Sequence, residues 1–275
     1  RLAAYKASLS QKELAAMVQE TRELKEYQET PSPQEDLEKI PMLRREDISR
    51  ECEEIVCRKQ QLGGILVLFS PMFTAGIGYI SLLFDTKGIP QEDLPYVGLL
   101  KSALGYVDTE NYWYEDLTSE IYLNSGGIDF SVTSYANLKE PENFTGAFVA
   151  RAKVLYDKAD FAFSILAEML TRSKLDDEKR LGEILAETRS KARMRLEGAS
   201  HSAAVARATS YFSPTSSFND CTGGIGYYFF LDQVCRDYEK PENRKALTKK
   251  LSQVCSRLST RNHLLVRFTA QESGY

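Results

Sequence analysis

The spacing of hydrophobic residues near the N-terminus predicts a helix with one apolar face. Ser10-Gln11-Lys12-Glu13 matches the capping box, in which serine and glutamate side chains satisfy free backbone donors at a helix start. We therefore predict a helix from this cap to about Tyr27. Its apolar stripe needs a partner surface, and consists of Leu14, Met17, Val18, Thr21 and Leu24.

The next segment, "QETPSPQEDLEKIPMLRREDISRE", breaks this helical pattern. Its prolines, Pro31, Pro33 and Pro41, interrupt helical geometry, and its charge is high. These features predict a surface connector and a domain boundary near residue 60. We expect a helical hairpin and connector over residues 1–59 and one domain over residues 60–275.

After the boundary the pattern changes to that of strands. The segments "GGILVLFSP" and "GIGYISLLFD" are rich in β-branched and aromatic residues and are separated by a turn. Further on, "IDFSVTSYAN" alternates: Ile128, Phe130 and Val132 fall on one face and polar residues on the other. We predict a strand there, a second strand over about 144–155 paired with it, and a closing strand, "HLLVRFTAQ", that begins at His263.

Helical patterns occupy most of the remaining chain. The predicted helices cover about 93–105, 114–124, 158–171, 176–198, 203–212, 224–238 and 241–258. Strands gathered with helix pairs between them indicate an α+β fold, in which helices pack on a mostly antiparallel sheet in two layers.

Composition excludes several classes of function. Hydrophobic residues make up 43% of the chain, and the net charge of −4 offers no basic face for nucleic acid. The apolar runs at 65–69 and 77–84 are shorter than the roughly 20 residues that span a bilayer, so we expect no membrane partner. The five cysteines form no C-x-x-C pair, which predicts a reducing compartment rather than disulfides or a zinc ribbon.

Polar candidates for chemistry are few. His201 and His263 have no carboxylate or cysteine beside them in the sequence, so we interpret both as structural. Asp176, Asp177 and Glu178 stand at a predicted helix start, where acidic side chains act as caps. The sequon at Asn143 is interpreted as a chance match, because the cysteine usage argues against secretion.

Two further motifs also have structural interpretations. The segment "CTGGIGYYFF" contains Gly223, Gly224 and Gly226, but their spacing matches no phosphate-binding loop, so we predict a turn into a helix. The aromatic residues that follow, 227–230, lack interleaved basic residues and are predicted to lie in the core.

One long segment carries a family resemblance. From Leu82 to Asn137 the chain reads "LLFDTKGIPQEDLPYVGLLKSALGYVDTENYWYEDLTSEIYLNSGGIDFSVTSYAN". It resembles a half-domain of the pitrilysin/insulysin superfamily of zinc metallopeptidases, in its presequence-protease-like branch. The resemblance rests on the combination of Phe84-Asp85-Thr86, Ile89-Pro90, Asp93-Leu94-Pro95-Tyr96, Tyr114 with Leu117, and Gly126-Gly127. It covers most of the chain and is strongest over residues 8–137.

The resemblance implies that this copy of the domain is catalytically silent. Active copies carry H-x-x-E-H on the corresponding helix, with two histidines as zinc ligands and the glutamate as base. Here the histidine positions fall at Tyr96 and Leu100 and the glutamate at Leu99. Leucine offers no lone pair to zinc and no proton acceptor. We therefore predict no catalytic residue and no metal ligand in this chain.

The resemblance also implies a role. We expect a non-catalytic domain of the C-terminal half of a zinc metalloendopeptidase that degrades unfolded peptides, forming part of the substrate chamber. Zinc is expected in the catalytic half. The expected partners are that N-terminal half, the final domain of the same polypeptide and unfolded peptides. Because the sequence starts at Arg1 with apolar residues directly following, we expect it to be part of a longer chain. Bacterial cytoplasm is the expected location, with the mitochondrial matrix or another organelle as alternative.

Two other functions stay open. One is a non-catalytic scaffold of the same fold with no protease in the parent, comparable to the core proteins of respiratory complexes. The other is a thiol enzyme that uses Cys221, Cys235 or Cys255 with His201. Such a thiol would need a lowered pKa.

Overall fold

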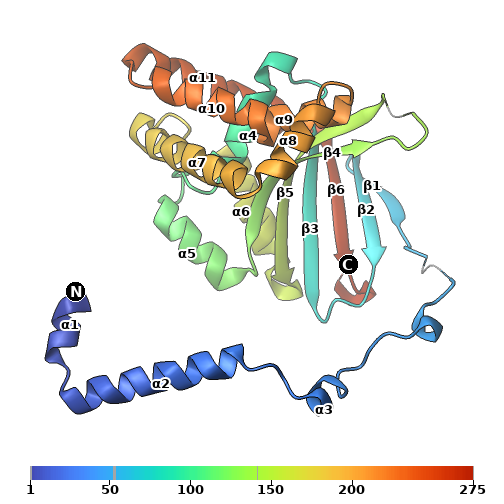
Figure 1. The fold of residues 1–275 in the computed structure, drawn as a ribbon. Helices are drawn as coiled ribbons and strands as arrows, with labels where there is room; N and C mark the ends of the chain where they lie inside the picture. Colours follow the sequence, from blue (N-terminus) through green and yellow to red (C-terminus); the bar gives the residue numbers. More distant parts are fainter. Residues whose placement is uncertain (1, 52–53, 141, 275) are drawn as a thin grey trace. The chain divides into compact units, whose positions relative to one another are not determined.

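The computed structural model describes residues 2–51, 54–140 and 142–274. By its internal contacts the chain divides into two compact units, Arg1–Glu54 and Ile55–Tyr275. Figure 1 shows the helices and strands that make up each unit.

The first unit is a succession of helices without a core. It contains α1 (Leu2–Ser8), α2 (Gln11–Glu29), α3 (Gln34–Leu37) and a 3-10 turn at Arg45–Asp47. The predicted capping box of α2 is confirmed: the Glu13 N–H donates to Ser10 Oγ at 3.3 Å, and the Ser10 N–H donates to Glu13 Oε2 at 2.8 Å. No residue of α2 is buried within the described structure, and Val18 is 63% exposed. The apolar stripe of α2 is therefore open.

The second unit is built on a sheet of six strands. They are β1 (Arg58–Leu62), β2 (Ile65–Pro71), β3 (Ile77–Asp85), β4 (Ile128–Ala136), β5 (Phe144–Leu155) and β6 (Leu264–Ala270), in the order β1-β2-β6-β3-β5-β4. Every neighbouring pair is antiparallel except β2 and β6. The mostly antiparallel sheet and the predicted pairing of 128–136 with 144–155 are confirmed.

Strand β1 escaped prediction because its sequence, "RKQQL", is polar and fully exposed, and carries no apolar alternation. It pairs with β2 through a tight turn at Gly63 and Gly64, which both have positive φ, of 56° and 84°. Two consecutive residues at positive φ form the hairpin turn that glycine accommodates without steric cost.

Eight helices of the second unit follow the predicted pattern with two exceptions. They are α4 (Leu94–Ala103), α5 (Tyr114–Asn124), α6 (Ala159–Thr171), α7 (Glu178–Gly198), α8 (Ser200–Thr209), α9 (Pro214–Gly223), α10 (Ile225–Asp237) and α11 (Pro241–Leu258). Helix α8 begins three residues before the predicted start. Helix α9 was not predicted, because "PTSSFNDCTG" is rich in weak helix formers. It starts at Pro214 in the first turn and at the Ser213 cap.

The core lies between one face of the sheet and the helices. Sheet residues such as Ile80, Phe148 and Ala150 pack there with Leu99 and Leu166 in one hydrophobic cluster. Residues one position along each strand point to the opposite face. That opposite face, termed the open face below, carries the side chains of Tyr79, Ser81, Arg151, Lys153 and Arg267.

Candidate functional site

Helix α4, where the resemblance would place a zinc motif, is part of the core. Leu99 is fully buried and Leu100 is 1% exposed. Tyr96 packs edge-on against Phe230, with ring centres 4.9 Å apart, and burial raises the pKa of its hydroxyl. A Cβ on Gly98 would lie 2.5 Å from the backbone oxygen of Thr222. This helix provides hydrophobic packing, and its side chains do not fit a zinc ion.

The carboxylate nearest to α4 is already paired. Asp93, in the turn Gln91–Asp93 that leads into the helix, is 3% exposed. Its oxygens lie 2.8 Å from Lys250 Nζ and 3.8 Å from the Arg257 guanidinium. A carboxylate held by two cations is stabilised in its ionised form and anchors α11 to the start of α4. Within the described ranges, no three His, Cys, Asp or Glu side chains gather as a metal-binding group.

The two histidines lie in different settings. His201 is an exposed residue at the start of α8, as predicted. His263 lies in a 3-10 turn, Arg261–His263, so the prediction that it begins the strand was wrong by one residue. Its Nδ1 is 3.1 Å from Asp85 Oδ1, a contact between residues 178 positions apart that the sequence did not indicate.

The cysteines proposed for thiol chemistry are held in their neutral form. The thiols of Cys221 and Cys255 donate to backbone carbonyls of Phe218 and Leu170, at 3.1 and 3.5 Å. Burial raises the pKa of each to about 11, and burial also raises the pKa of Cys235. Since the thiolate is the nucleophile, this environment opposes thiol catalysis.

The remaining motifs have structural roles. Asp177 caps α7 by accepting from the Arg180 N–H at 2.9 Å, which confirms the predicted cap. Gly224 joins α9 to α10, and the Gly226 N–H donates to Asp220 at 3.2 Å. The positive end of α10 thus already faces a carboxylate. Tyr227 is buried as predicted, whereas Phe229 is 62% exposed, because it points away from the face of α10 that packs inward.

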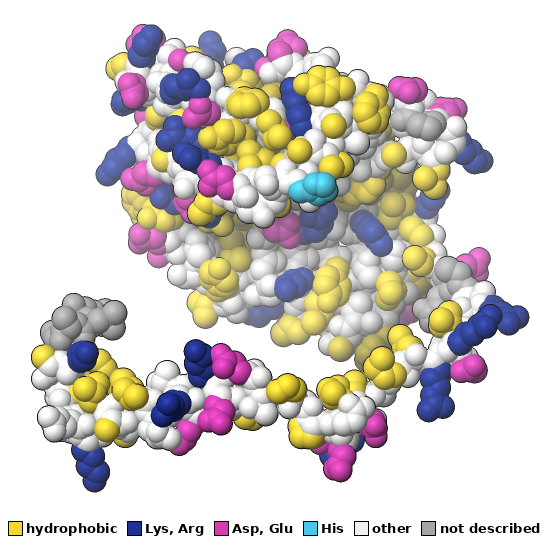
Figure 2. All heavy atoms as spheres, viewed as in Figure 1, with side chains coloured by type: hydrophobic (Ala, Val, Ile, Leu, Met, Phe, Trp, Pro, Cys, Tyr) yellow, Lys and Arg dark blue, Asp and Glu magenta, His cyan; other side chains and the backbone are white. Residues whose placement is uncertain are grey.

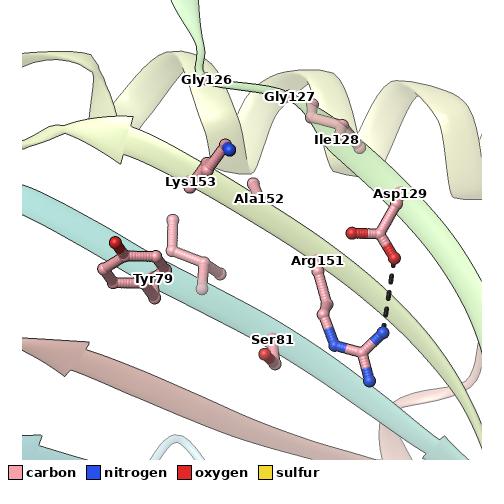
Figure 3. Close-up of a pocket in the computed structure, with 10 residues that line it drawn as sticks. Tyr79, Ser81, Gly126, Gly127, Ile128, Asp129, Arg151, Ala152 and Lys153 are labelled. Carbon is pink, nitrogen blue, oxygen red and sulfur yellow. Dashed lines mark hydrogen bonds and ion pairs between the residues drawn. The ribbon is translucent and has the colours of Figure 1, made fainter. Parts of the chain in front are cut away.

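The open face of the sheet carries a row of mostly polar side chains. Strand registers place five of them side by side, in the order Leu68, Arg267, Ser81, Arg151 and Asp129. The Arg151 guanidinium reaches Asp129 at 3.3 Å (Figure 3) and also donates to Ser131 Oγ at 2.5 Å. Arg267 extends the positive charge of this row toward the middle of the sheet.

A hollow of about 290 Å³ lies beside this row (Figure 3). It is lined by residues of β3, β4 and β5, among them Tyr79, which is 44% exposed, and Lys153. The Lys153 stem covers Gly126, where a Cβ would lie 2.9 Å from its Cε. The hollow offers a cation, an aromatic ring and hydroxyl groups. This arrangement is suited to binding a polar chain.

This surface was missed from the sequence. The available signal was the period-two placement of Tyr79 and Ser81 in β3, and of Arg151 and Lys153 in β5, within strands that otherwise read as apolar. The alternation identifies side chains on one face of each strand. It does not reveal that the two strands are neighbours.

Comparison with known families agrees with the fold. The model for the associated domain of the peptidase M16 family, subfamily C, matches residues 1–234. The chain belongs to this family. Among described residues, no helix of this peptidase-associated chain combines the length and apolar character needed to cross a membrane.

Two relatives place the peptidase-associated chain within longer proteins. It is 32% identical to Protein HypA of Clostridium perfringens over all of this chain. It is 27% identical to Presequence protease 1, chloroplastic/mitochondrial, of Arabidopsis thaliana over 96% of this chain. The chain spans only 28% and 24% of the lengths of these relatives.

A solved structure shares the fold. A conserved protein from Enterococcus faecalis superposes with a TM-score of 0.54 at 12% identity, covering 79% of this chain and 49% of that one. At this identity the likeness shows the fold alone.

Proposed function

We propose that this domain is a non-catalytic wall of the substrate chamber in a presequence-protease-like zinc metalloendopeptidase. The observation that carries the proposal is the contrast across the sheet. Helix α4 has become a buried apolar helix where active copies would hold zinc, while the open face keeps solvent-accessible cations and an aromatic hollow. Catalysis and zinc then belong to the other half of the polypeptide.

The open face supports a role in contacting extended peptides. An unfolded peptide presents carbonyl oxygens and carboxylates, and the open face offers Arg151, Lys153 and Arg267 as donors. Charged side chains of one sign that line a concave surface attract ligands of the opposite sign. The face contains no nucleophile or general base beside them, so its contribution is binding.

The helical layer supports contact with other parts of the polypeptide. Figure 2 shows hydrophobic side chains gathered over α9 and α10. The exposed ones near this region include Phe212 at 77% and Phe229 at 62%. Apolar patches of this kind mark protein–protein contacts. The proposed partners are the catalytic half and the final domain of the same chain.

The test uses the full-length parent, with and without the double substitution Arg151→Glu and Lys153→Glu. Steady-state cleavage of an unstructured acidic peptide should show a KM raised about tenfold, with zinc content and kcat largely retained. The matched control is Lys245→Glu with Lys249→Glu, two exposed positions on α11 with the same change in charge.

An equal KM for both double variants would contradict contact between the open face and substrate. A parent that lacks H-x-x-E-H and binds no zinc would contradict the peptidase assignment. It would favour the non-catalytic scaffold instead.

A further inference from the structure

The two edges of the sheet differ in how they resist pairing with another strand. Strand β1 has five residues, begins with Arg58 and Lys59, and is exposed along its length. Short, charged edges of this kind discourage pairing. Strand β4 has nine residues, contains a single charged side chain, Asp129, and includes Ile128, Phe130 and Val132. The β4 edge therefore has the character of a strand that accepts a partner.

The backbone of β4 has hydrogen-bonding groups directed away from the sheet. The Lys153 N–H donates to the Gly127 carbonyl at 3.2 Å. In antiparallel pairs, residues alternate between bonding their partner and facing outward. Counting from Gly127, the backbone groups of Ile128, Phe130 and Val132 face outward. Within the described structure, no residue bonds these outward groups.

Two hollows follow this edge on the helical side. The first, about 280 Å³, lies at the start of β4 and includes Phe130, Tyr122 and Lys101 in its lining. The second, about 340 Å³, lies further along the strand and includes Val132, Asn219 and again Lys101. Lys101 of α4 thus stands between two hollows that together run along β4, termed the edge groove below.

Lys101 is a cation without a carboxylate partner among the described residues. Its Nζ lies 3.3 Å from the Thr222 carbonyl oxygen and 5.6 Å from the centre of the Tyr227 ring. Burial, and then the positive charge of Arg195, lower the pKa of Lys101. Arg195 is exposed and has no carboxylate partner in the described ranges either. An incoming carboxylate would be stabilised by both charges.

We propose that the edge groove binds an extended acidic peptide segment as a seventh strand beside β4, with a Glu or Asp side chain of the peptide paired to Lys101. The groove continues on both sides of Lys101, so a side chain within the segment fits better than a C-terminal carboxylate, which would leave one hollow empty. Main-chain bonds to β4 supply affinity, and the pocket at Lys101 supplies specificity. This inference rests on the proposed function and names how the domain would hold a peptide.

The test measures binding to this 275-residue chain by fluorescence anisotropy. The probe is a labelled Thr- and Val-rich peptide with one central Glu, compared with the same peptide carrying Gln and with one whose alternate backbone amides are N-methylated. We expect the Glu peptide to bind about tenfold more tightly than the Gln peptide. N-methylation should abolish binding, because it removes the donors that pair with β4.

Variants of the chain assign the effect to Lys101. Lys101→Met should erase the preference for Glu over Gln, Lys101→Arg should retain it, and Lys179→Met, at an exposed position on α7, should leave it unchanged. Thermal melts establish that each variant is folded. Equal affinity for the Glu and Gln peptides, an unaltered preference in Lys101→Met, or undiminished binding of the methylated peptide would overturn the inference. Peptide binding without peptidase activity in the parent would contradict the proposed function alone.

Discussion

Helices α2 and α4 both carry apolar side chains at helical spacing, yet they have opposite environments. In α4, Leu99 and Leu100 are buried beneath the sheet and the surrounding helices. In α2, no described side chain is buried, and Leu24 is 56% exposed. A hydrophobic stripe therefore records that a helix is able to pack, whereas burial depends on the surface that the rest of the molecule supplies. Matched substitutions in the two units test this difference.

The largest effect is expected from truncating the core of α4. Leu99→Ala should lower the free energy of unfolding by about 2–5 kcal/mol, because it removes buried methyl groups and leaves a cavity. Leu24→Ala in α2 is the matched control and should change it by less than about 0.5 kcal/mol. Urea denaturation followed by tryptophan fluorescence measures both. Equal losses would show that α2 is packed in solution.

A second effect concerns the close approach of α4 to α9. Gly98→Ala places a methyl group 2.5 Å from the Thr222 oxygen and 2.8 Å from the Tyr227 ring, so we expect a loss of about 1–3 kcal/mol. Gly198→Ala at the end of α7 meets no atom within 4 Å and should be nearly neutral. Thermal melts of both variants make the comparison. A neutral Gly98→Ala would show that this contact relaxes freely.

A third effect separates a buried carboxylate from an exposed one. Burial of Glu168 would raise its pKa, but bonds from Thr109 and Asn111 and the charge of Arg172 lower it below 4.5. Because the pKa is lower in the folded chain, Glu168 stabilises the fold above the unfolded pKa, and this contribution is lost as pH falls through the folded value. Glu168→Gln should therefore flatten the decline in stability below about pH 5.

The corresponding residue of α2 supplies the control. Hydrogen bonds from the Ser10 side chain and backbone lower the pKa of Glu13, but this carboxylate is exposed. Glu13→Gln should leave the acid unfolding of the 55–275 unit unchanged. Unfolding curves between pH 3 and pH 7 measure both variants. An equal response to the two substitutions would contradict the distinction between the buried and the exposed site.

The smallest global effect is expected from the cap of α2. Ser10→Ala removes the acceptor for the Glu13 N–H and should weaken the helix by about 0.5–2 kcal/mol. Because α2 belongs to a separate compact unit, the loss should appear as reduced helical circular dichroism at low temperature. The main unfolding transition should stay in place. A shifted main transition would indicate that the two units unfold together.

Sequence reasoning reached most elements because they depend on local spacing. The Ser10 cap, the alternation of β4 and the limits of α5 and α11 follow from side chains within a few residues of one another. The same reasoning placed Leu99 and Leu100 in a helix without zinc ligands. It missed β1 and α9, whose polar sequences become ordered through neighbours, the β2 strand in one case and α4, α8 and α10 in the other.

The candidate surfaces depended on contacts between distant segments. Strand β6, at the end of the chain, inserts between β2 and β3 and brings Arg267 beside Ser81. The edge groove joins Lys101 of α4 to β4 and α9. The sequence alone determined which segments are helices or strands and which of their faces are apolar, because those properties repeat with the period of the backbone. The tertiary structure alone decided strand order, the open face and the exposed edge, because chain segments become neighbours only through the packing of the whole domain.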